Sequence, residues 1–157
     1  MTMIKREFSI LRDGELNRTV HIHKCTINEM LINLMLFNDR MIEMIGKAML
    51  RVKPDKYSEY RRGLTALILL QLSRKVKGRP VKISLQVPVL FHRLQLQQQE
   101  IKKLITGCMK INLNKKKVNF IPMGIFRISI GDAIEYLLLC QNHYLVMARQ
   151  ILMLQNL

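Results

Sequence analysis

The sequence lacks residue types on which whole classes of fold depend. It has no tryptophan, and only 7 glycines and 4 prolines among 157 residues. An all-β domain needs turn residues about every 8 to 12 positions, so this composition does not suit a sandwich or barrel. Methionine occurs 11 times and 49% of the residues are hydrophobic, which favours a folded, mostly helical chain.

Cysteine and long apolar runs are scarce as well. Cys25, Cys108 and Cys140 are far apart and odd in number, so we expect no disulfide framework and a reducing compartment. The N-terminus is charged where a secretion signal needs an apolar run, and the longest apolar runs, such as residues 67–70, fall short of the roughly 18 residues that span a bilayer. These absences predict a cytoplasmic protein without membrane contact.

Acidic residues are few, and the deficit is local. The chain has 26 Lys and Arg against 11 Asp and Glu, a net charge of +15. Residues 1–46 and 118–157 are each neutral, whereas residues 47–117 hold 18 Lys and Arg against 3 Asp and Glu. Such confinement predicts a surface for a polyanion, and nucleic acid fits better than a membrane because no segment has the apolar face of an interfacial helix. Solvated helix faces are the simpler alternative.

Two elements are predicted in the first third of the chain. Residues 5–11 and 17–24 are extended in character, and the Asp13-Gly14 pair between them is typical of a β-hairpin turn. The sequence Thr-Ile-Asn-Glu at residues 26–29 is a capping box, and it begins a long helix with apolar residues at helical spacing.

The rest of the chain predicts helices separated by short extended segments. A helix over residues 57–75 is expected to bury the following side chains: Leu64, Leu67, Ile68 and Leu70. Alternation predicts a strand over residues 81–87, which Pro88 ends. The later elements, in chain order, are a helix over residues 89–110, a basic loop over 112–117, a short edge strand over 118–121, and an apolar helix from Ser129 to the end. The fold class is α+β and mostly helical.

One segment resembles a known family. Lys82-Ile83-Ser84-Leu85-Gln86-Val87-Pro88, followed by a helix, is similar to the ribbon-helix-helix (MetJ and Arc type) DNA-binding transcriptional regulators. In that family two strands pair into an antiparallel ribbon that enters the major groove, and two helices follow each strand. The resemblance implies a sequence-specific regulator bound to double-stranded DNA, nucleoid-associated in the cytoplasm of a bacterium or carried by a plasmid, with no cofactor.

The resemblance also implies which residues contact DNA. The base contacts are polar residues of two strands: Lys82, Ser84, Gln86, Thr19, His21 and His23. The phosphate contacts are two serines at helix starts, Ser58 and Ser129, whose free amides favour an anion. Further phosphate contacts are basic residues: Arg61, Arg62, Arg74, Lys75, Lys77, Arg79, Lys115, Lys116 and Lys117.

The architecture implied is a single DNA-binding domain over residues 1–157, with long helices and an extra N-terminal hairpin. It consists of two strand-helix-helix halves, residues 17–77 and 81–157. If both halves are real, one chain makes a pseudo-symmetric ribbon; if only one is, a homodimer is required. Which strand forms the ribbon stays open, and residues 82–87 also suit an ordinary edge strand.

Other chemistries have less support. His21, His23 and Cys25 share a strand face, but no fourth ligand stands at a zinc-binding spacing, so no metal site is predicted. The chain has no nucleophile elbow or phosphate-binding loop, and carboxylates are scarce where it is basic, so we expect no enzyme. The alternatives to DNA regulation are a structural RNA-binding protein and an adaptor whose apolar C-terminal helix docks on a partner.

Overall fold

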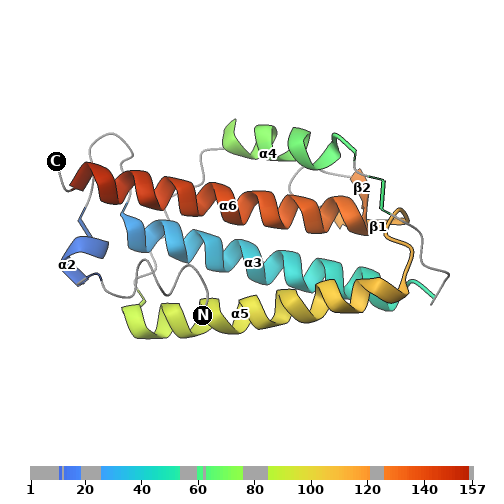
Figure 1. Ribbon diagram of the computed structural model, residues 1–157, viewed down its shortest axis with the longest axis horizontal. Helices are drawn as coiled ribbons and strands as arrows, with labels where there is room; N and C mark the ends of the chain where they lie inside the picture. The colour runs from blue at the N-terminus through green and yellow to red at the C-terminus, as the bar shows by residue number, and fades with distance from the viewer. Residues whose placement is uncertain are drawn as a thin grey trace. The chain divides into compact units, whose positions relative to one another are not determined.

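The computed structural model describes residue 11 and residues 13–18, 26–53, 60–61, 63–75, 85–120 and 126–155. Its elements, in chain order, are α2 (Asp13–Leu16), α3 (Ile27–Leu50), α4 (Thr65–Lys75), α5 (Val87–Gly107), the 3-10 helix η1 (Cys108–Lys110), β1 (Lys116–Phe120), β2 (Phe126–Ser129) and α6 (Ile130–Gln155) (Figure 1). The described residues are mostly helical and include one two-stranded antiparallel sheet. The α+β, mostly helical fold class is confirmed, whereas the ribbon-helix-helix arrangement stays a prediction.

The chain divides into two compact units made of discontinuous segments. Unit 1 comprises residues 1–37, 78–98 and 141–157, and unit 2 comprises residues 38–77 and 99–140. The three long helices α3, α5 and α6 each contribute one part to unit 1 and the other to unit 2. The units therefore do not follow the consecutive halves, 17–77 and 81–157, that the sequence suggested.

Hydrogen bonds in unit 1 cap the start of α3 and join it to the residues after α2. The amide of Thr26 donates to Glu29 Oε2 at 2.8 Å, and the amide of Glu29 donates to Thr26 Oγ1 at 3.0 Å, so the predicted capping box is confirmed. The Asn28 side chain donates to Asn17 Oδ1 at 2.9 Å and ties α2 to α3. Residues 13–16, expected within a hairpin turn, form the short helix α2 instead, because one helical turn places Leu16 in the core, where it is 1% exposed.

The core of unit 1 is mostly apolar, and three amide side chains among its described residues are buried: Asn28, Gln97 and Gln141. Its largest side chains come from α2, α3, α5 and α6: Leu16, Ile27, Leu31, Ile32, Leu34, Leu90, Leu94 and Ile151. Gln97 is fully buried beside them, and its Nε2 donates to the Met35 carbonyl oxygen at 2.8 Å, which satisfies a group that would otherwise be costly to bury. The C-terminal half of α6 thus contributes Ala148 and Ile151 to this core, whereas its Val146 and Met153 are exposed.

The core of unit 2 gathers α4 and the remaining parts of the long helices. Met41, Ile45 and Ala48 of α3 are buried, as are Ile101 of α5 and Leu137 of α6. The Cys108 thiol at the start of η1 lies 3.7 Å from Met49 Sδ, and burial raises the pKa of that thiol to about 11. The end of α3 therefore packs against the end of α5.

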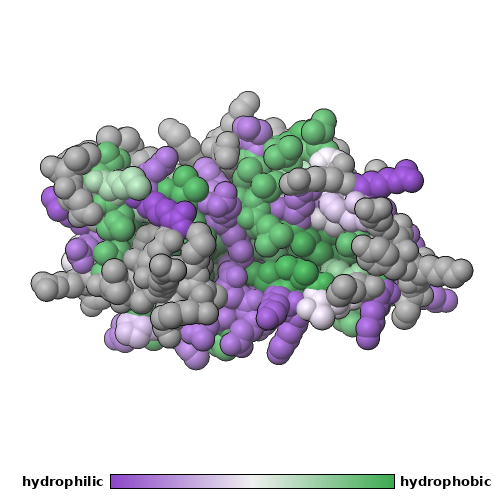
Figure 2. Space-filling view, in the orientation of Figure 1, coloured by the Kyte–Doolittle hydropathy of each residue, from purple (hydrophilic) through white to green (hydrophobic). Residues whose placement is uncertain are grey.

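Helix α4 differs from its prediction at its start and in its buried face. Residues 60, 61 and 63 are not helical, and the helix begins at Thr65. Ala66, Leu69 and Leu70 are buried, whereas Leu64, Leu67 and Ile68 are 70%, 44% and 54% exposed. Of the four side chains predicted to be buried, only Leu70 is inside. Figure 2 shows hydrophobic side chains gathered at the surface where α4 lies.

The strand predicted over residues 81–87 does not extend over its last three residues. Val87 is the first residue of α5, and Leu85 and Gln86 belong to no strand. Pro88 lies in the first turn of the helix, where its missing amide costs nothing, rather than marking the end of a strand. Residues 81–84 lie outside the described part of the chain.

The other extended segments form a hairpin. The predicted edge strand over residues 118–121 is confirmed as β1, which begins two residues earlier and takes in Lys116 and Lys117 of the expected basic loop. Its antiparallel partner β2 was not predicted. The final helix begins directly after Ser129, as expected. No helix in the part of the chain that the structure describes is long and apolar enough to cross a bilayer.

Candidate nucleic-acid interface

Unit 2 carries most of the excess positive charge. Its segments hold 17 Lys and Arg against 7 Asp and Glu, a net charge of +10, whereas unit 1 holds 9 against 4, a net charge of +5. Neither unit is neutral, although both ends of the sequence are, because residues 47–117 are divided between the two units. A binding surface is therefore best sought within unit 2.

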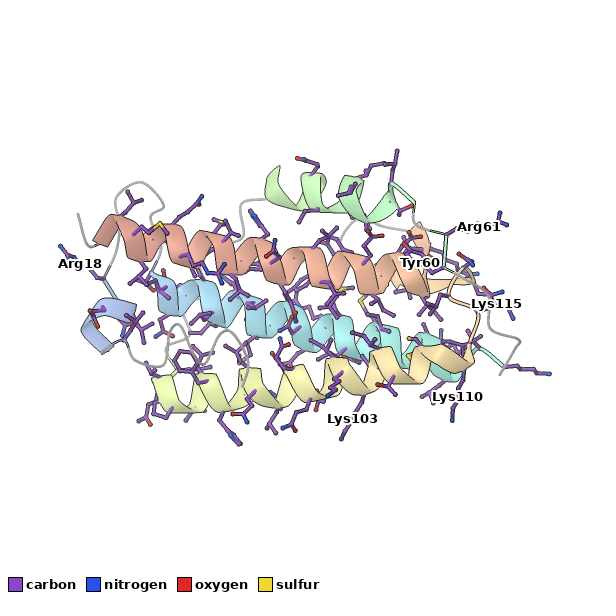
Figure 3. The ribbon with its side chains drawn as sticks, in the orientation of Figure 1. Arg18, Tyr60, Arg61, Lys103, Lys110 and Lys115 are labelled. Carbon is purple, nitrogen blue, oxygen red and sulfur yellow. The ribbon has the colours of Figure 1, made fainter. Side chains whose placement is uncertain are left out.

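Basic side chains gather where the helices of unit 2 end. The end of α3 lies next to η1 through Met49 and Cys108, and η1 leads through residues 111–115 into the hairpin. Exposed or half-buried cations come from each of these segments and from residue 61. We call this set the basic end: Arg51, Lys53, Arg61, Lys110, Lys115 and Arg127. Figure 3 shows Arg61, Lys110 and Lys115 projecting outward there from three segments.

The loop that carries Lys115 is held by hydrogen bonds at both its sides. The amide of Asn114 donates to Asn112 Oδ1 at 3.0 Å, and the amide of Lys115 donates to the Asn112 carbonyl at 3.3 Å. The first amides of α6 donate to the same loop, Ile130 to the Lys115 carbonyl and Gly131 to the Leu113 carbonyl. A loop fixed in this way loses little conformational freedom when a ligand binds beside it.

Arg61 is fixed beside this loop by its backbone. Its amide donates to Asn114 Oδ1 at 3.0 Å, and the preceding residue, Tyr60, donates from its hydroxyl to carboxylates of α6. The hydroxyl lies 3.0 Å from Asp132 Oδ1 and 2.9 Å from Glu135 Oε2. Burial, and then these two carboxylates, raise the pKa of Tyr60 well above its usual range, so the phenol stays protonated and keeps donating.

Two described carboxylates beside Tyr60 are therefore engaged by the protein. Asp132 accepts at 2.6 Å from Ser129 Oγ, and Asp132 and Glu135 share the single hydroxyl proton of Tyr60. Both side chains are half-buried. Other described carboxylates of unit 2 lie along α3 and α5, at Asp39, Glu43 and Glu100. Among the described residues of unit 2, the six cations of the basic end thus outnumber the five carboxylates, two of which already accept hydrogen bonds from Tyr60 and Ser129.

The hairpin has one buried face and one exposed face. Val118 pairs with Ile128, and both are buried, whereas Asn119 pairs with Arg127, and both are exposed. The register shifts between Lys116 and Val118, which leaves Lys116 and Lys117 together opposite Ser129. Such a bulge increases the local twist of a strand pair.

Ser129 stands at the start of α6 as predicted, but its surroundings do not leave room for a phosphate. Its side chain is 5% exposed, and its Oγ accepts from the Asp132 amide at 2.9 Å. The first three amides of the helix therefore already donate to protein oxygens, and the Asp132 carboxylate adds negative charge. Ser129 acts as the N-cap of α6, and it is not part of the basic end.

The remaining predicted contacts are placed only in part. Gln86 is exposed, lies in unit 1 and precedes α5, where its carbonyl accepts from the Leu90 amide at 3.1 Å. Four predicted phosphate contacts lie at the end of α4 or in β1, and their side chains are outside the described residues: Arg74, Lys75, Lys116 and Lys117. The others lie wholly outside the described part of the chain: Thr19, His21, His23, Ser58, Arg62, Lys77, Arg79, Lys82 and Ser84.

Several residues of the basic end were not singled out in the sequence. Arg127 belongs to a strand of only 4 residues, and Lys110 ends a short 3-10 helix, so neither stands in a recognisable pattern. Tyr60 and Asn114 act over separations of 72 and 53 residues, which no local motif reveals. The alternation of apolar and polar residues at Phe126-Arg127-Ile128-Ser129 was the one sequence signal for the second strand.

Metal-dependent chemistry has no candidate among the described residues. No group of three or more His, Cys, Asp and Glu side chains in these segments could hold a metal ion. His21, His23 and Cys25, weighed as zinc ligands, lie outside the described segments.

Comparison with known proteins assigns no family to the chain. No family model matches it, and no curated protein or solved structure matches it either. Function must therefore be inferred from the charge, exposure and contacts of the chain's own residues.

Proposed function

We propose that this protein binds nucleic acid through the basic end of unit 2, and that its ligand is duplex DNA, whose transcription it regulates. The observation that carries the proposal is the convergence of exposed or half-buried cations from five segments on one end of a unit with a net charge of +10. The choice of duplex DNA rests on the resemblance to ribbon-helix-helix regulators.

A polyanion suits this surface better than a single small anion. The cations of the basic end are spread over the ends of α3 and α5, the loop and the hairpin, rather than directed at one point. Each phosphate that a Lys or Arg neutralises releases condensed counterions, so many separate ion pairs add up to strong, salt-dependent affinity. The hydrogen bonds that fix Arg61 and the loop further support binding without rearrangement.

Binding to a random-sequence DNA duplex at several salt concentrations tests the proposal. Wild type is compared with single alanine variants of Arg61, Lys115 and Arg127. Arg40→Ala is the matched control, because Arg40 is an exposed arginine of unit 2 that lies about 15 Å along α3 from the end of that helix. We expect each basic-end variant to lower affinity, and to reduce the salt slope by ~0.9 for each phosphate that it no longer neutralises.

Two results would contradict this function. If wild type shows no salt-dependent binding to duplex DNA, the basic end is not a DNA surface. If Arg40→Ala loses as much affinity as the other variants, general charge rather than this surface accounts for binding. A structured RNA competitor that displaces the duplex at equal concentration would favour the RNA-binding alternative.

The exposed apolar face of α4 supports a second candidate function, an adaptor that docks on another protein. Leu67 and Ile68 are exposed on a helix whose opposite face is buried, and Leu64, just before that helix, is exposed as well. Clustered apolar residues of this kind are common at protein–protein interfaces. The adaptor predicted from the sequence uses the C-terminal helix. That helix, α6, buries Leu137 and Ile151 but exposes Leu138, Val146 and Met153, so it offers a second apolar surface for docking.

A further inference from the structure

We propose that the β1–β2 hairpin reads base sequence in the major groove of duplex DNA, with Asn119 and Arg127 as its base-contacting pair. This inference rests on the proposed function and adds to it a source of sequence specificity. It also moves base reading away from residues 82–86, since Val87 already belongs to α5 and Gln86 is not in a strand.

The hairpin presents the two side chains together. Asn119 and Arg127 are directly opposite each other in the ladder, and cross-strand partners project from the same face of a sheet. Both are exposed, whereas the neighbouring pair, Val118 and Ile128, is 1% and 4% exposed and holds the other face against the core. The polar pair is thus directed away from unit 2.

The chemistry of the pair suits base edges. An arginine guanidinium can donate two hydrogen bonds to the O6 and N7 atoms of guanine, and an asparagine amide can pair with the N6 and N7 atoms of adenine. Both groups are planar and form two hydrogen bonds to a single base. Side by side on one face, they can reach neighbouring base pairs, which predicts a preference for a short step containing guanine and adenine.

The end of the hairpin next to α6 is held firmly enough to fix the positions of Asn119 and Arg127. β2 continues directly into α6, where Ser129 caps the helix, and the residues before β1 accept the first α6 amides. Arg61 and Lys115 lie beside this end of the hairpin, where they can contact phosphates that flank the groove. Phosphate contacts would set the register and the paired side chains would read the bases.

The shape of a two-stranded ribbon favours DNA over double-stranded RNA. The major groove of B-form DNA is about 12 Å wide and admits such a ribbon. The major groove of an A-form RNA helix is deep and narrow and does not admit it. Duplex DNA is therefore the expected ligand of the hairpin, and RNA becomes an outcome of the test.

The test selects preferred sites from 20-base-pair duplexes with a random centre, using the wild-type protein. Affinity for a selected site is then compared with that for a random duplex in three variants. Arg127→Lys keeps the charge but loses the planar fork, so we expect its preference for the selected site to fall about tenfold with an unchanged salt slope. Asn119→Ala should lose a similar part of the preference. Arg61→Lys is the matched control and should keep it.

A chemical substitution in the DNA tests whether the protein contacts guanine from the major groove. Replacing guanine by 7-deazaguanine in the selected site removes the N7 acceptor, which lies only in the major groove. Wild type should bind the modified site about tenfold more weakly, and Arg127→Ala, which has no donor at this position, should not distinguish the two sites.

The outcomes separate this inference from the proposed function. Salt-dependent binding with no selectable preference, or a preference that Arg127→Lys and 7-deazaguanine leave unchanged, overturns the hairpin as the reader while nucleic-acid binding stands. Tighter binding to structured RNA than to any duplex also overturns it. Absence of salt-dependent binding overturns the proposed function itself. Loss of preference in Arg127→Lys and Asn119→Ala, but not in Arg61→Lys, supports the inference.

Discussion

Gly131, in the first turn of α6, lies against the aromatic ring of Tyr60, 71 positions earlier in the chain. A Cβ at residue 131 would overlap three ring carbons of that tyrosine. The ring therefore occupies the space that any other residue's side chain would need, and only glycine permits the Tyr60 hydroxyl to reach Asp132 and Glu135. This close packing fastens the segment that carries Arg61 to the start of the last helix.

Gly131→Ala should displace Tyr60 and lower the free energy of unfolding by about 1–3 kcal/mol, the usual cost of overpacking a well-filled site. Urea denaturation measures the change. Gly46→Ala is the control, and its expected change has the opposite sign. Gly46 lies inside α3, and a Cβ there would meet only the Leu104 side chain, at an ordinary contact distance of 4.0 Å. That substitution should stabilise the protein by about 0.5–1 kcal/mol. Equal stability of Gly131→Ala and wild type would mean that the Tyr60 ring does not fill this space in solution.

Removal of the Tyr60 hydroxyl should change how stability depends on alkaline pH. The folded protein raises the pKa of Tyr60 above its ordinary value of 10.0, so deprotonation favours the unfolded chain. Stability from this group is complete below about pH 10 and is lost as pH rises above it. Tyr60→Phe lacks the group, so the stability difference between wild type and this variant should shrink from pH 8 to pH 11. Urea midpoints at the two pH values measure it, and a constant difference would contradict the raised pKa.

Helix capping by Ser129 can be separated from anion binding. Ser129→Ala should cost about 1 kcal/mol of stability, close to the cost of Thr26→Ala at the start of α3, because both hydroxyls cap a helix. Since the first α6 amides are already bonded within the protein, Ser129→Ala should leave affinity for duplex DNA within about twofold of wild type. A larger loss of affinity in the folded variant would restore Ser129 as a phosphate contact.

The two faces of α4 should respond differently to truncation. Leu69→Ala removes a side chain that is 7% exposed and should cost about 2–5 kcal/mol. Ile68→Ala removes one that is 54% exposed and should cost less than about 0.5 kcal/mol. Thermal or urea unfolding measures both. The reverse order would mean that the face predicted from the sequence is the buried one after all.

Local signals in the sequence predicted the elements that depend on local hydrogen bonds. The capping box at Thr26 sets the start of α3 through bonds that span three residues, and the same is true of Ser129 and α6. Such interactions can be seen in a short stretch of sequence. The predicted starts of both helices therefore agree with the structure.

Elements set by distant interactions were not predictable in this way. The start of α4 was placed too early because Tyr60 and Arg61 bond to residues 53 to 75 positions away rather than to the next helical turn. Its buried face was misassigned because residues 64–72 are apolar almost throughout, so spacing alone does not select a face. Pro88 is compatible both with the end of a strand and with the start of a helix. The helix is favoured because it buries Leu90 and Leu94, which are one turn apart, in the core.

The candidate site was predictable in kind but not in place. The local excess of Lys and Arg indicated a polyanion surface, and Arg61, Lys115, Lys116 and Lys117 were among the residues named for it. Arg127 became part of the surface only because β2 pairs with β1. A stretch of four residues has too little pattern to predict that pairing from sequence.

The division of α6 between the two units has a consequence for how the protein folds. Residues 130–140 belong to unit 2 and residues 141–155 to unit 1, so one continuous helix contributes to both cores. The apolar faces of α3 and α5 in either unit are therefore incomplete until α6 has docked. We expect the two units to unfold together in one cooperative transition, and a chain truncated before residue 130 to expose both cores and to aggregate.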